Sequence, residues 1–283
     1  MTNPPHQTLS QIKALLTAHG VRPRHRWGQN FLVDANKLGA ILDAAGAGGG
    51  DHVLEVGPGT GALTVPLLGA GVNLTAVEID PVMVAILRDV VGEDREGVFR
   101  LIQTDVLASK HALDGEVAAA LPGEGVPLKL VANLPYNVAS PLLVVLATGC
   151  VDLCSAVVMI QLEVADRIGA GPGTKVYGPL SVMLQSLFEV ERVATLPPSC
   201  FWPKPKISSA VIKLRRRAEP LTGDSRRLAG LLHTLFSKRR KQIGSILGRD
   251  TELPAGIRAD QRPEELSVEQ LCELAESVDP DRE

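Results

Sequence analysis

A glycine-rich turn that directly follows a short apolar segment is the feature that most restricts how this chain of 283 residues folds. Residues 52–57 have the pattern of a buried strand, and Gly57-Pro-Gly59-Thr-Gly61 leads from it into a helical stretch. Strand-like and helix-like segments then alternate as far as residue 214. Alternation of this kind is typical of α/β proteins with a mostly parallel, doubly wound sheet. We therefore predict such a sheet, with seven strands.

Apolar periodicity places the individual elements. We predict strands over residues 52–57, 73–79, 98–105, 128–132, 156–161, 190–196 and 209–214. We predict helices over residues 9–19, 34–45, 62–68, 81–91, 141–147, 226–236, 239–247 and 268–276, and one within 177–188. Only helical patterns remain after residue 217. The expected domains are residues 1–217, with an N-terminal helical lid, and a smaller all-α domain over residues 218–283.

The formal net charge of −3 hides an uneven distribution of charge. Residues 204–241 hold twelve Lys and Arg against two acids, whereas residues 250–283 hold eleven acids against three arginines. Positive surfaces attract phosphate backbones, which predicts a nucleic-acid partner, although solvated surface charge is the alternative. The candidate RNA-binding residues are Arg24, Arg26, Lys204, Lys206, Lys238, Arg239, Arg240 and Lys241.

Several classes of protein are excluded by the remaining composition. The longest uncharged run, residues 138–151, is too short to span a bilayer, and residues 1–11 hold no apolar stretch typical of a signal peptide. The four cysteines have no partners at metal-site spacing, so we expect neither a disulfide scaffold nor a metal. Free thiols indicate a reducing, cytoplasmic location.

A ligand cradle is predicted where three consecutive strands end. Gly57, Gly59 and Gly61 allow the backbone to turn tightly and to approach a ligand. Glu78 ends the second strand, where a carboxylate can accept hydrogen bonds from both hydroxyls of a ribose. Asp105 ends the third strand, where it could hold an adenine amino group. Ligands bind at strand ends of this kind in doubly wound sheets.

The glycine pattern alone leaves the bound nucleotide open. Gly57-x-Gly59-x-x-Ala62 also satisfies the dinucleotide fingerprint, so an NAD-dependent oxidoreductase remains an alternative at this point. The residues that end the fourth strand decide between the two.

The tetrapeptide Asn133-Leu134-Pro135-Tyr136 follows that fourth strand and fits the demands of methylating an exocyclic adenine nitrogen. The lone pair of that nitrogen is delocalised into the ring, so the nitrogen is a poor nucleophile. The Asn133 side-chain carbonyl and the Leu134 backbone carbonyl could hold both N–H groups and favour a more tetrahedral nitrogen. Pro135 stiffens the turn, and Tyr136 offers a ring for stacking, with Phe201 as the candidate for the opposite face. Positioning would then carry the rate.

The motifs together resemble the ribosomal RNA adenine dimethyltransferases, in particular the bacterial enzymes of the small subunit. The resemblance covers roughly residues 10–247. It rests on Gly28-Gln-Asn-Phe-Leu32, Glu55-Val-Gly-Pro-Gly-Thr-Gly61, Glu78-Ile-Asp80, Asn133-Leu-Pro-Tyr136, Pro172-Gly-Thr-Lys-Val-Tyr-Gly178, Phe201-Trp-Pro-Lys-Pro-Lys206 and Phe236-Ser-Lys-Arg-Arg-Lys241, in this order.

The resemblance implies a Rossmann-like, class I methyltransferase domain with S-adenosyl-L-methionine as donor and S-adenosyl-L-homocysteine as product. It implies a substrate of two adjacent adenines near the 3′ end of 16S ribosomal RNA, each dimethylated at N6, within the small ribosomal subunit or its precursor. A cytoplasmic monomer without a membrane partner is expected. The implied cofactor-binding residues are Gln29, Asn30, Leu32, Gly57, Gly59, Gly61, Glu78, Ile79, Asp105, Val106 and Asn133.

Three positions depart from the pattern of that family. Leu162 stands where lysine is usual, and Gln242 and Ser245 replace a usual threonine and asparagine. These changes concern RNA contacts more than methyl transfer. Alternatives that remain are a large-subunit RNA adenine methyltransferase of the antibiotic-resistance type, a non-catalytic ribosome-assembly factor, and the NAD-dependent oxidoreductase.

Overall fold

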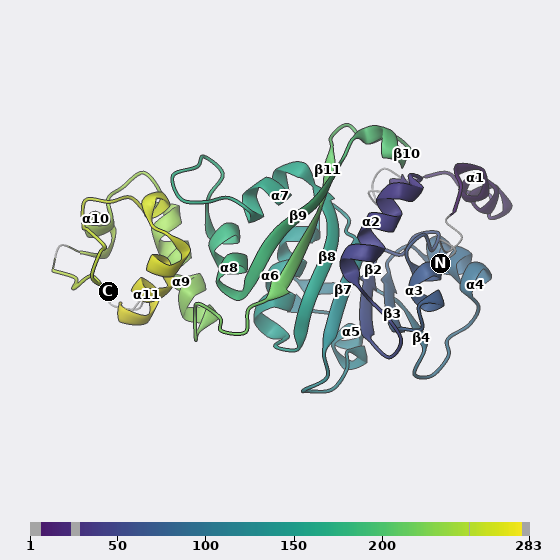
Figure 1. The fold of residues 1–283 in the computed structure, drawn as a ribbon, viewed down its shortest axis with the longest axis horizontal. Helices are drawn as coiled ribbons and strands as arrows, with labels where there is room; N and C mark the ends of the chain where they lie inside the picture. The colour runs from purple at the N-terminus through teal and green to yellow at the C-terminus, as the bar shows by residue number, and fades with distance from the viewer. Residues whose placement is uncertain (1–6, 24–28, 249, 279–283) are drawn as a thin grey trace. The chain divides into compact units, whose positions relative to one another are not determined.

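A seven-stranded sheet with the order β4-β3-β2-β7-β8-β11-β9 is the centre of the fold (Figure 1). The structure is a computed structural model and describes residues 7–23, 29–248 and 250–278. The pairs β2–β3, β2–β7, β3–β4 and β7–β8 are parallel, as the alternation of elements predicted. The strands are β2 (His52–Val56), β3 (Asn73–Glu78), β4 (Phe99–Gln103), β7 (Leu128–Asn133), β8 (Leu153–Gln161), β9 (Phe188–Leu196) and β11 (Ser209–Arg216).

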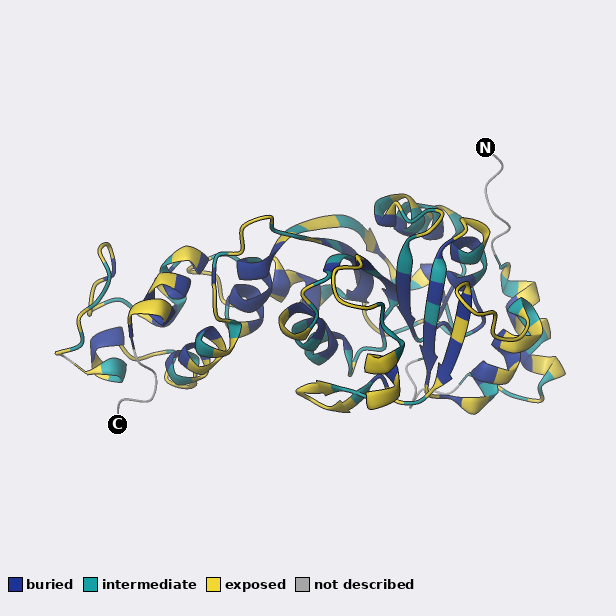
Figure 2. Cartoon of the chain, turned by 90° about the horizontal axis from the view of Figure 1, so that it is seen from below, coloured by how far each residue is buried: buried dark blue, intermediate teal, exposed yellow. Residues whose placement is uncertain are grey.

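Helices cover the sheet, and two of them begin at the caps that the sequence predicts. The Asp34 carboxylate caps α2, and the Asp80 carboxylate caps α4, whose first residue is Pro81. Helix α2 contacts β7 and β8, and α3 and α4 contact β3. The helices of this part are α1 (Leu9–Ala18), α2 (Ala35–Ala45), α3 (Thr64–Gly69), α4 (Pro81–Val91), α5 (Gly115–Ala120) and α6 (Ala139–Gly149). Figure 2 shows the strands of the sheet as mostly buried and the helices as buried on one side.

Short elements that leave no signal in the sequence complete this part. Strands β5 (Leu107–Ser109) and β6 (Ala112–Leu113) form a small antiparallel pair. Strands β1 (Phe31–Leu32) and β10 (Phe201–Trp202) form another, although they are far apart in the sequence. Two-residue strands carry too little periodicity to be recognised in a sequence.

The chain divides into two compact units, and their boundaries correct the expected domains. The first unit holds residues 1–162 and 191–214, and the second holds residues 163–190 and 215–283. A single boundary after residue 217 therefore misses the segment 163–190. This segment contains α8 (Pro179–Leu187) and all but the first residue of α7 (Leu162–Ile168), and α8 packs on the later helices α9 (Ser225–Ser237) and α11 (Val268–Ser277). Contacts between distant segments decide such a boundary, and local patterns do not report them.

A buried aromatic and an ion pair organise the second unit. Tyr177 is fully buried, donates a hydrogen bond from its hydroxyl to the carbonyl of Leu266 at 3.0 Å, and meets the ring of Phe236 edge-on. Arg239 forms an ion pair with Glu264 and donates to the backbone carbonyl of Thr174. These contacts join the loop before α8 to the segment between α10 (Ile243–Leu247) and α11.

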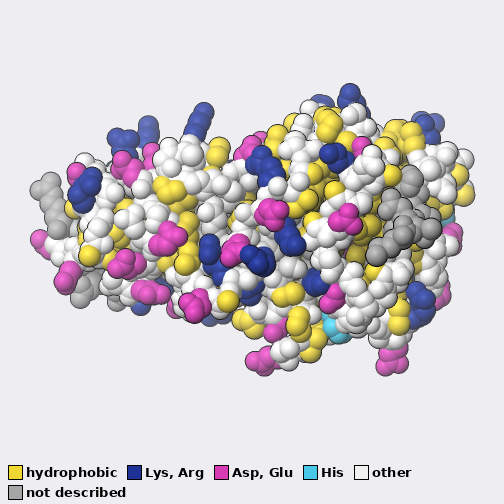
Figure 3. Space-filling model, in the orientation of Figure 1, with side chains coloured by type: hydrophobic (Ala, Val, Ile, Leu, Met, Phe, Trp, Pro, Cys, Tyr) yellow, Lys and Arg dark blue, Asp and Glu magenta, His cyan; other side chains and the backbone are white. Residues whose placement is uncertain are grey.

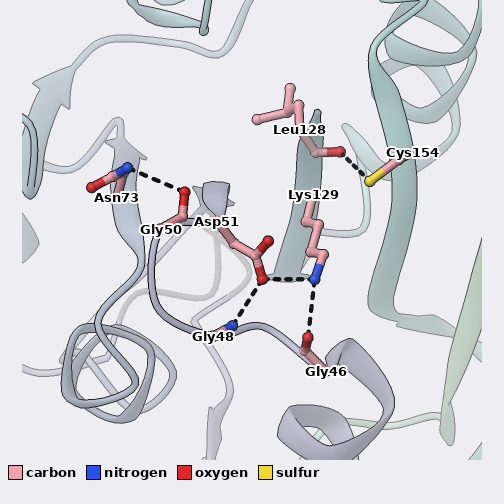
Figure 4. A network of polar contacts seen from close by, with 8 residues as sticks. All are labelled: Gly46, Gly48, Gly50, Asp51, Asn73, Leu128, Lys129 and Cys154. Atoms are coloured by element: carbon pink, nitrogen blue, oxygen red, sulfur yellow. Dashed lines mark hydrogen bonds and ion pairs between the residues drawn. The ribbon is translucent and has the colours of Figure 1, made fainter. Parts of the chain in front are cut away.

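A polar network closes the end of the sheet at which β2 and β7 begin (Figure 4). The Lys129 ammonium on β7 donates to the Asp51 carboxylate at 2.7 Å and to the Gly46 carbonyl at 2.9 Å. Asp51 also accepts from the Gly48 amide at 2.8 Å. The hydrogen bond from Lys129 lowers the pKa of the Asp51 carboxyl below its usual value. Lys129 thus fixes the loop between α2 and β2 against the centre of the sheet.

Replacing Lys129 with methionine is expected to lower the free energy of unfolding by about 1–2 kcal/mol at pH 7, because two hydrogen bonds of a half-buried ammonium are lost while the stem still packs. A lowered carboxyl pKa stabilises the fold above the unfolded value of 3.8, and this stabilisation is lost as the pH falls through the folded pKa. Urea unfolding followed by circular dichroism at pH 7 and at about pH 3 tests this. An equal difference at both pH values would contradict the assigned ion pair.

Candidate active site

Four neighbouring parallel strands end at one edge of the sheet and bring the predicted site residues together. Asp105 follows β4, Glu78 ends β3, the glycine turn follows β2, and Asn133 ends β7. A pocket lies at this edge, and residues from all four strand ends line it. Of the predicted catalytic and cofactor-binding residues, the pocket is lined by Gln29, Asn30, Leu32, Gly57, Gly59, Glu78, Ile79, Asp105, Val106, Asn133, Leu134, Pro135, Tyr136 and Phe201.

The glycine turn forms one wall of the pocket, and one of its three glycines has another task. Gly57 has a φ of +71°, and a Cβ there would lie 3.4 Å from the ring of Pro135. This close approach keeps the turn beside the tetrapeptide. Gly61, expected among the cofactor-binding residues, is not part of the pocket lining, and a Cβ there would lie 3.0 Å from Leu87 of α4. The third glycine thus permits close packing of a helix against the turn, and its contact with a cofactor stays a prediction.

Two buried carboxyl groups line the pocket. Glu55 is 1% exposed and accepts a hydrogen bond from the Thr64 hydroxyl at 2.8 Å. Loss of solvation raises the pKa of Glu55 to about 8, and the nearby Glu78 adds to this. Burial also raises the pKa of Glu78, although the backbone N–H groups of Asp80 and Gly59 donate to its carboxylate at 2.9 and 3.3 Å and oppose that rise. A cation in this pocket would relieve the cost of both buried carboxylates.

The lining of the pocket suits a ligand that carries positive charge. Glu55, Glu78 and Asp105 line it, and none of its described lining residues is Lys or Arg. Ionised carboxyl groups attract a sulfonium or an ammonium group, and such a cation would also favour the ionised form of Glu55. The half-exposed Ile79 adds an apolar contact surface at the same place.

The tetrapeptide is held rigidly beside this pocket. The Asn133 side-chain amide donates to the backbone carbonyl of Asn30 at 3.4 Å, and this contact turns the amide so that its oxygen is left to accept from a ligand. The Leu134 amide donates to the carbonyl of Met159 on β8 at 3.0 Å. The Tyr136 hydroxyl lies 3.3 Å from that of Ser209, which fixes the ring at the start of β11.

The aromatic residues separate into two groups. Phe201 lines the pocket with Tyr136 but is only 5% exposed, and its backbone pairs with Leu32. Trp202 stacks on Phe31 with ring centroids 6.4 Å apart, and the Lys13 ammonium lies 5.3 Å from the Trp202 ring. Trp202 and Phe31 thus join the N-terminal segment to β10. Tyr177, by contrast, is fully buried in the core of the second unit.

Comparisons with known proteins agree with this geometry. Residues 20–279 match the family described as Ribosomal RNA adenine dimethylase. The chain belongs to the ribosomal RNA adenine dimethylase family. It is 38% identical over 281 residues to the ribosomal RNA small subunit methyltransferase A of Streptomyces coelicolor, covering 94% of this chain and 95% of that protein. It is 40% identical over 258 residues to the protein of the same name from Xanthomonas campestris, covering 88% and 93%.

Solved structures place the fold of this adenine dimethylase family member among methyltransferases. A dimethyladenosine transferase from Plasmodium falciparum superposes with a TM-score of 0.70, 23% identity and coverage of 86% of this chain and 95% of that one. The 23S rRNA methyltransferase ErmE superposes with a TM-score of 0.65, 27% identity and coverage of 88% and 99%. The predicted α/β methyltransferase fold is confirmed, and the protein is a methyltransferase that acts on adenine in ribosomal RNA.

The predicted RNA-binding residues that the structure describes lie in two places. Lys204 and Lys206 are exposed in the loop after β10, and Arg24 and Arg26 lie outside the described residues. Lys238, Arg240 and Lys241 are exposed in the turn after α9, whereas Arg239 is held by Glu264. Figure 3 shows basic and acidic side chains interspersed on the face that it presents. Among the described residues, no helix combines the length and the apolar character needed to cross a membrane.

Sequence reasoning missed two residues of the site. Thr60 and Glu55 line the pocket, and both belong to the glycine motif, of which only the glycines were expected to matter. Gln7 contacts Thr60 with its side chain, and no pattern in the sequence marks that residue. A single polar residue ahead of a helix gives no local signal of a contact with a residue 53 positions away.

Proposed function

We propose that this protein transfers methyl groups from S-adenosyl-L-methionine to N6 of two adjacent adenines near the 3′ end of 16S ribosomal RNA and dimethylates each during small-subunit maturation. One observation carries the proposal. The Asn133–Tyr136 tetrapeptide and the acid-lined pocket share the same sheet edge, so that a bound donor and a target base meet beside the Asn133 side chain. The proposed substrate is the small ribosomal subunit or its precursor, and the proposed state is a cytoplasmic monomer.

The residues that line the pocket suit S-adenosyl-L-methionine by their chemistry. When bound, this cofactor supplies an activated methyl group and carries positive charge. The Glu78 carboxylate would accept from the ribose hydroxyls, since each of its oxygens retains a lone pair beyond the backbone N–H that it already accepts. Asp105, with Ile79 and Val106 beside it, would bind the adenine end. Gln29, Asn30 and Leu32 would cover the cofactor from the N-terminal side.

The residues of the tetrapeptide prepare the adenine amino group. The Asn133 Oδ1 and the Leu134 carbonyl accept its two hydrogens and so draw the nitrogen lone pair out of conjugation. Tyr136 and Phe201 are proposed to hold the two faces of the base. No strong general base is needed, because the proton leaves after the nitrogen has gained the methyl group and become cationic. Positioning by rigid elements therefore supplies most of the rate.

Two observations favour the small-subunit substrate over a large-subunit one. The curated relatives at 38% and 40% identity are small-subunit methyltransferases by name, whereas the 23S rRNA methyltransferase is 27% identical. The chain also carries a second unit with an exposed basic turn, residues 238, 240 and 241. We propose that this unit contributes RNA contacts. A purely non-catalytic assembly role is disfavoured, because every predicted catalytic residue lines the pocket.

Mapping of the modified positions tests the proposal. Purified protein and labelled S-adenosyl-L-methionine are incubated with undermethylated 30S particles, with naked 16S RNA and with 23S RNA, and the RNA is digested for mass spectrometry. Dimethyladenosine at two neighbouring positions near the 3′ end of 16S RNA is expected. Dimethyladenosine in 23S RNA alone, or none in any substrate, refutes the proposal.

Neutralising the exposed basic turn is expected to weaken RNA binding and to flatten its salt dependence. The triple variant Lys238→Gln, Arg240→Gln, Lys241→Gln removes three cations, and each lost phosphate contact should reduce the slope of log K against log salt by about 0.7–0.9. Filter binding or fluorescence anisotropy at several salt concentrations measures this slope. Arg239 stays in place, because its ion pair with Glu264 makes it part of the fold.

A control variant with the same change in net charge distinguishes a direct RNA contact of the turn from a general effect of net charge on RNA binding. Arg95, Arg100 and Lys110 are exposed cations of the first unit, and their change to glutamine alters the net charge by the same amount. This control should shift the salt slope much less. If both triple variants flatten the slope equally, the turn after α9 has no special place in the interface.

A further inference from the structure

The side chain of Gln7 forms two hydrogen bonds with the glycine turn. Its amide nitrogen donates to the backbone carbonyl of Thr60 at 2.5 Å, and the Thr60 hydroxyl donates to its amide oxygen at 2.7 Å. Thr60 is 1% exposed and lines the pocket. A carboxamide that both donates to and accepts from one residue is fixed in orientation, because a rotated amide would lose both bonds.

Helix α1, which follows Gln7 in the sequence, packs against other elements of the first unit. Thr8 begins α1 with a capping box that it shares with Gln11. Ile12 and Leu16 are buried in a cluster that includes Met83 and Ile86 of α4. The far end of α1 is held by the His19 ring, whose Nε2 lies 2.8 Å from the Asp89 carboxylate. Gln7 therefore extends from a fixed helix start directly onto the glycine turn.

The same N-terminal segment reaches the pocket again after α1. The Gln29 amide donates to the Asp80 carboxylate at 2.8 Å, and the Asn30 carbonyl accepts from Asn133. Phe31 and Leu32 line the pocket through β1. The N-terminal arm, defined as residues 7–23 and 29–33, thus contacts the glycine turn, the cap of α4 and the catalytic amide. Its described residues therefore border the pocket from the glycine turn to the Asn133 amide.

We propose that Gln7 is a positioning residue whose double hydrogen bond to Thr60 holds the N-terminal arm closed over the cofactor and sets the rate of cofactor release. This inference rests on the proposed cofactor. Gln7 does not touch the reacting atoms in this assignment. Its effect is on the residence time of the cofactor.

Release of cofactor from the full-length protein tests the proposal without RNA. Labelled S-adenosyl-L-methionine is bound, an excess of unlabelled cofactor is added, and dissociation is followed with time. Gln7→Ala is expected to release the cofactor about tenfold faster, the size typical for the loss of two hydrogen bonds. The Michaelis constant for the cofactor should rise while turnover at saturation changes less than twofold.

Matched variants isolate the contact. Thr60→Val removes the donor to Gln7 and should accelerate release, whereas Thr60→Ser keeps both bonds and should restore the native rate. The effects of Gln7→Ala and Thr60→Val should be less than additive, because they remove the same contact. Gln11→Ala frays α1 without touching Thr60 and should leave release within about twofold of the native rate.

Three outcomes overturn the proposal. Unchanged release in Gln7→Ala removes the contact from the release step. Equal acceleration by Gln11→Ala attributes the effect to fraying of α1. Failure of the unaltered protein to bind the cofactor refutes the proposed function itself, and the inference falls with it; cofactor binding with unchanged release in Gln7→Ala refutes the inference alone.

Discussion

Replacing Asn133 with alanine is expected to lower the turnover number for adenine methylation by about two to three orders of magnitude, the usual cost of one positioned group that stabilises charge in the transition state. The Asn133 oxygen is proposed to accept a hydrogen from the adenine amino group, and alanine offers no acceptor. RNA affinity should remain nearly native, because the basic residues proposed to contact RNA lie elsewhere. Single-turnover methylation and RNA binding, measured on the same preparation, test both halves.

The aspartate variant sharpens that test. Asn133→Asp keeps an acceptor but loses the N–H that donates to the Asn30 carbonyl, so the carboxylate is no longer oriented by the N-terminal arm. Its turnover should lie between those of the native protein and the alanine variant. Parallel loss of methylation and RNA affinity in Asn133→Ala would contradict a catalytic role, since it would indicate a damaged fold.

Removing the Glu78 carboxylate is expected to raise the Michaelis constant for S-adenosyl-L-methionine by about 100-fold, because two hydrogen bonds to a charged acceptor are lost together. Glu78 ends β3, is 6% exposed, and is positioned by the backbone N–H groups of Asp80 and Gly59. Glu78→Ala removes the acceptor, and Glu78→Gln keeps its volume. Isothermal titration with the cofactor measures the affinity directly.

The pH dependence of cofactor affinity provides a second test of the role of Glu78. Burial raises its pKa, so its acceptor strength should fall as the pH is lowered through that raised value. Cofactor affinity of the native protein should therefore weaken toward low pH, and Glu78→Gln should flatten this dependence. An effect of Glu78→Ala confined to RNA affinity would show that the ribose assignment is wrong.

The two buried carboxyl groups indicate how the pocket selects its ligand. Burial destabilises the ionised forms of Glu55 and Glu78, and a positively charged ligand stabilises these forms. The neutral thioether of the product lacks this interaction. The charge of the donor thus offers a reason for product to leave, and the arm held by Gln7 offers a barrier to early loss of the donor.

Much of the first unit could be predicted because its signals are local. Strand and helix periods, the caps Asp34 and Asp80, and motifs at strand ends each lie within a few residues. In a parallel sheet, strand ends meet at one edge, so the alternation of strands and helices alone places Glu78, Asp105 and Asn133 together. That rule is why most of the candidate site could be predicted.

Contacts across long separations were decided only by the tertiary structure. The packing around Gly61 depends on Leu87, and the ion pair of Arg239 depends on Glu264, and neither partner is marked by a pattern. Tyr177 has the sequence surroundings of a loop aromatic but is fully buried, and its hydroxyl donates to the carbonyl of Leu266, 89 positions later. The type of a residue limits which groups it can bind, whereas the tertiary fold determines which of those groups lie within its reach.

The sequence by itself therefore determined the α/β order, the chemistry at the strand ends and the family. Only the folded chain decided that residues 163–190 belong with the second unit, and that Gln7 reaches Thr60. The physical reason is that periodicity and helix caps arise from interactions between residues close in the sequence. The contact of Gln7 with Thr60 instead depends on side chains that only the whole fold brings together.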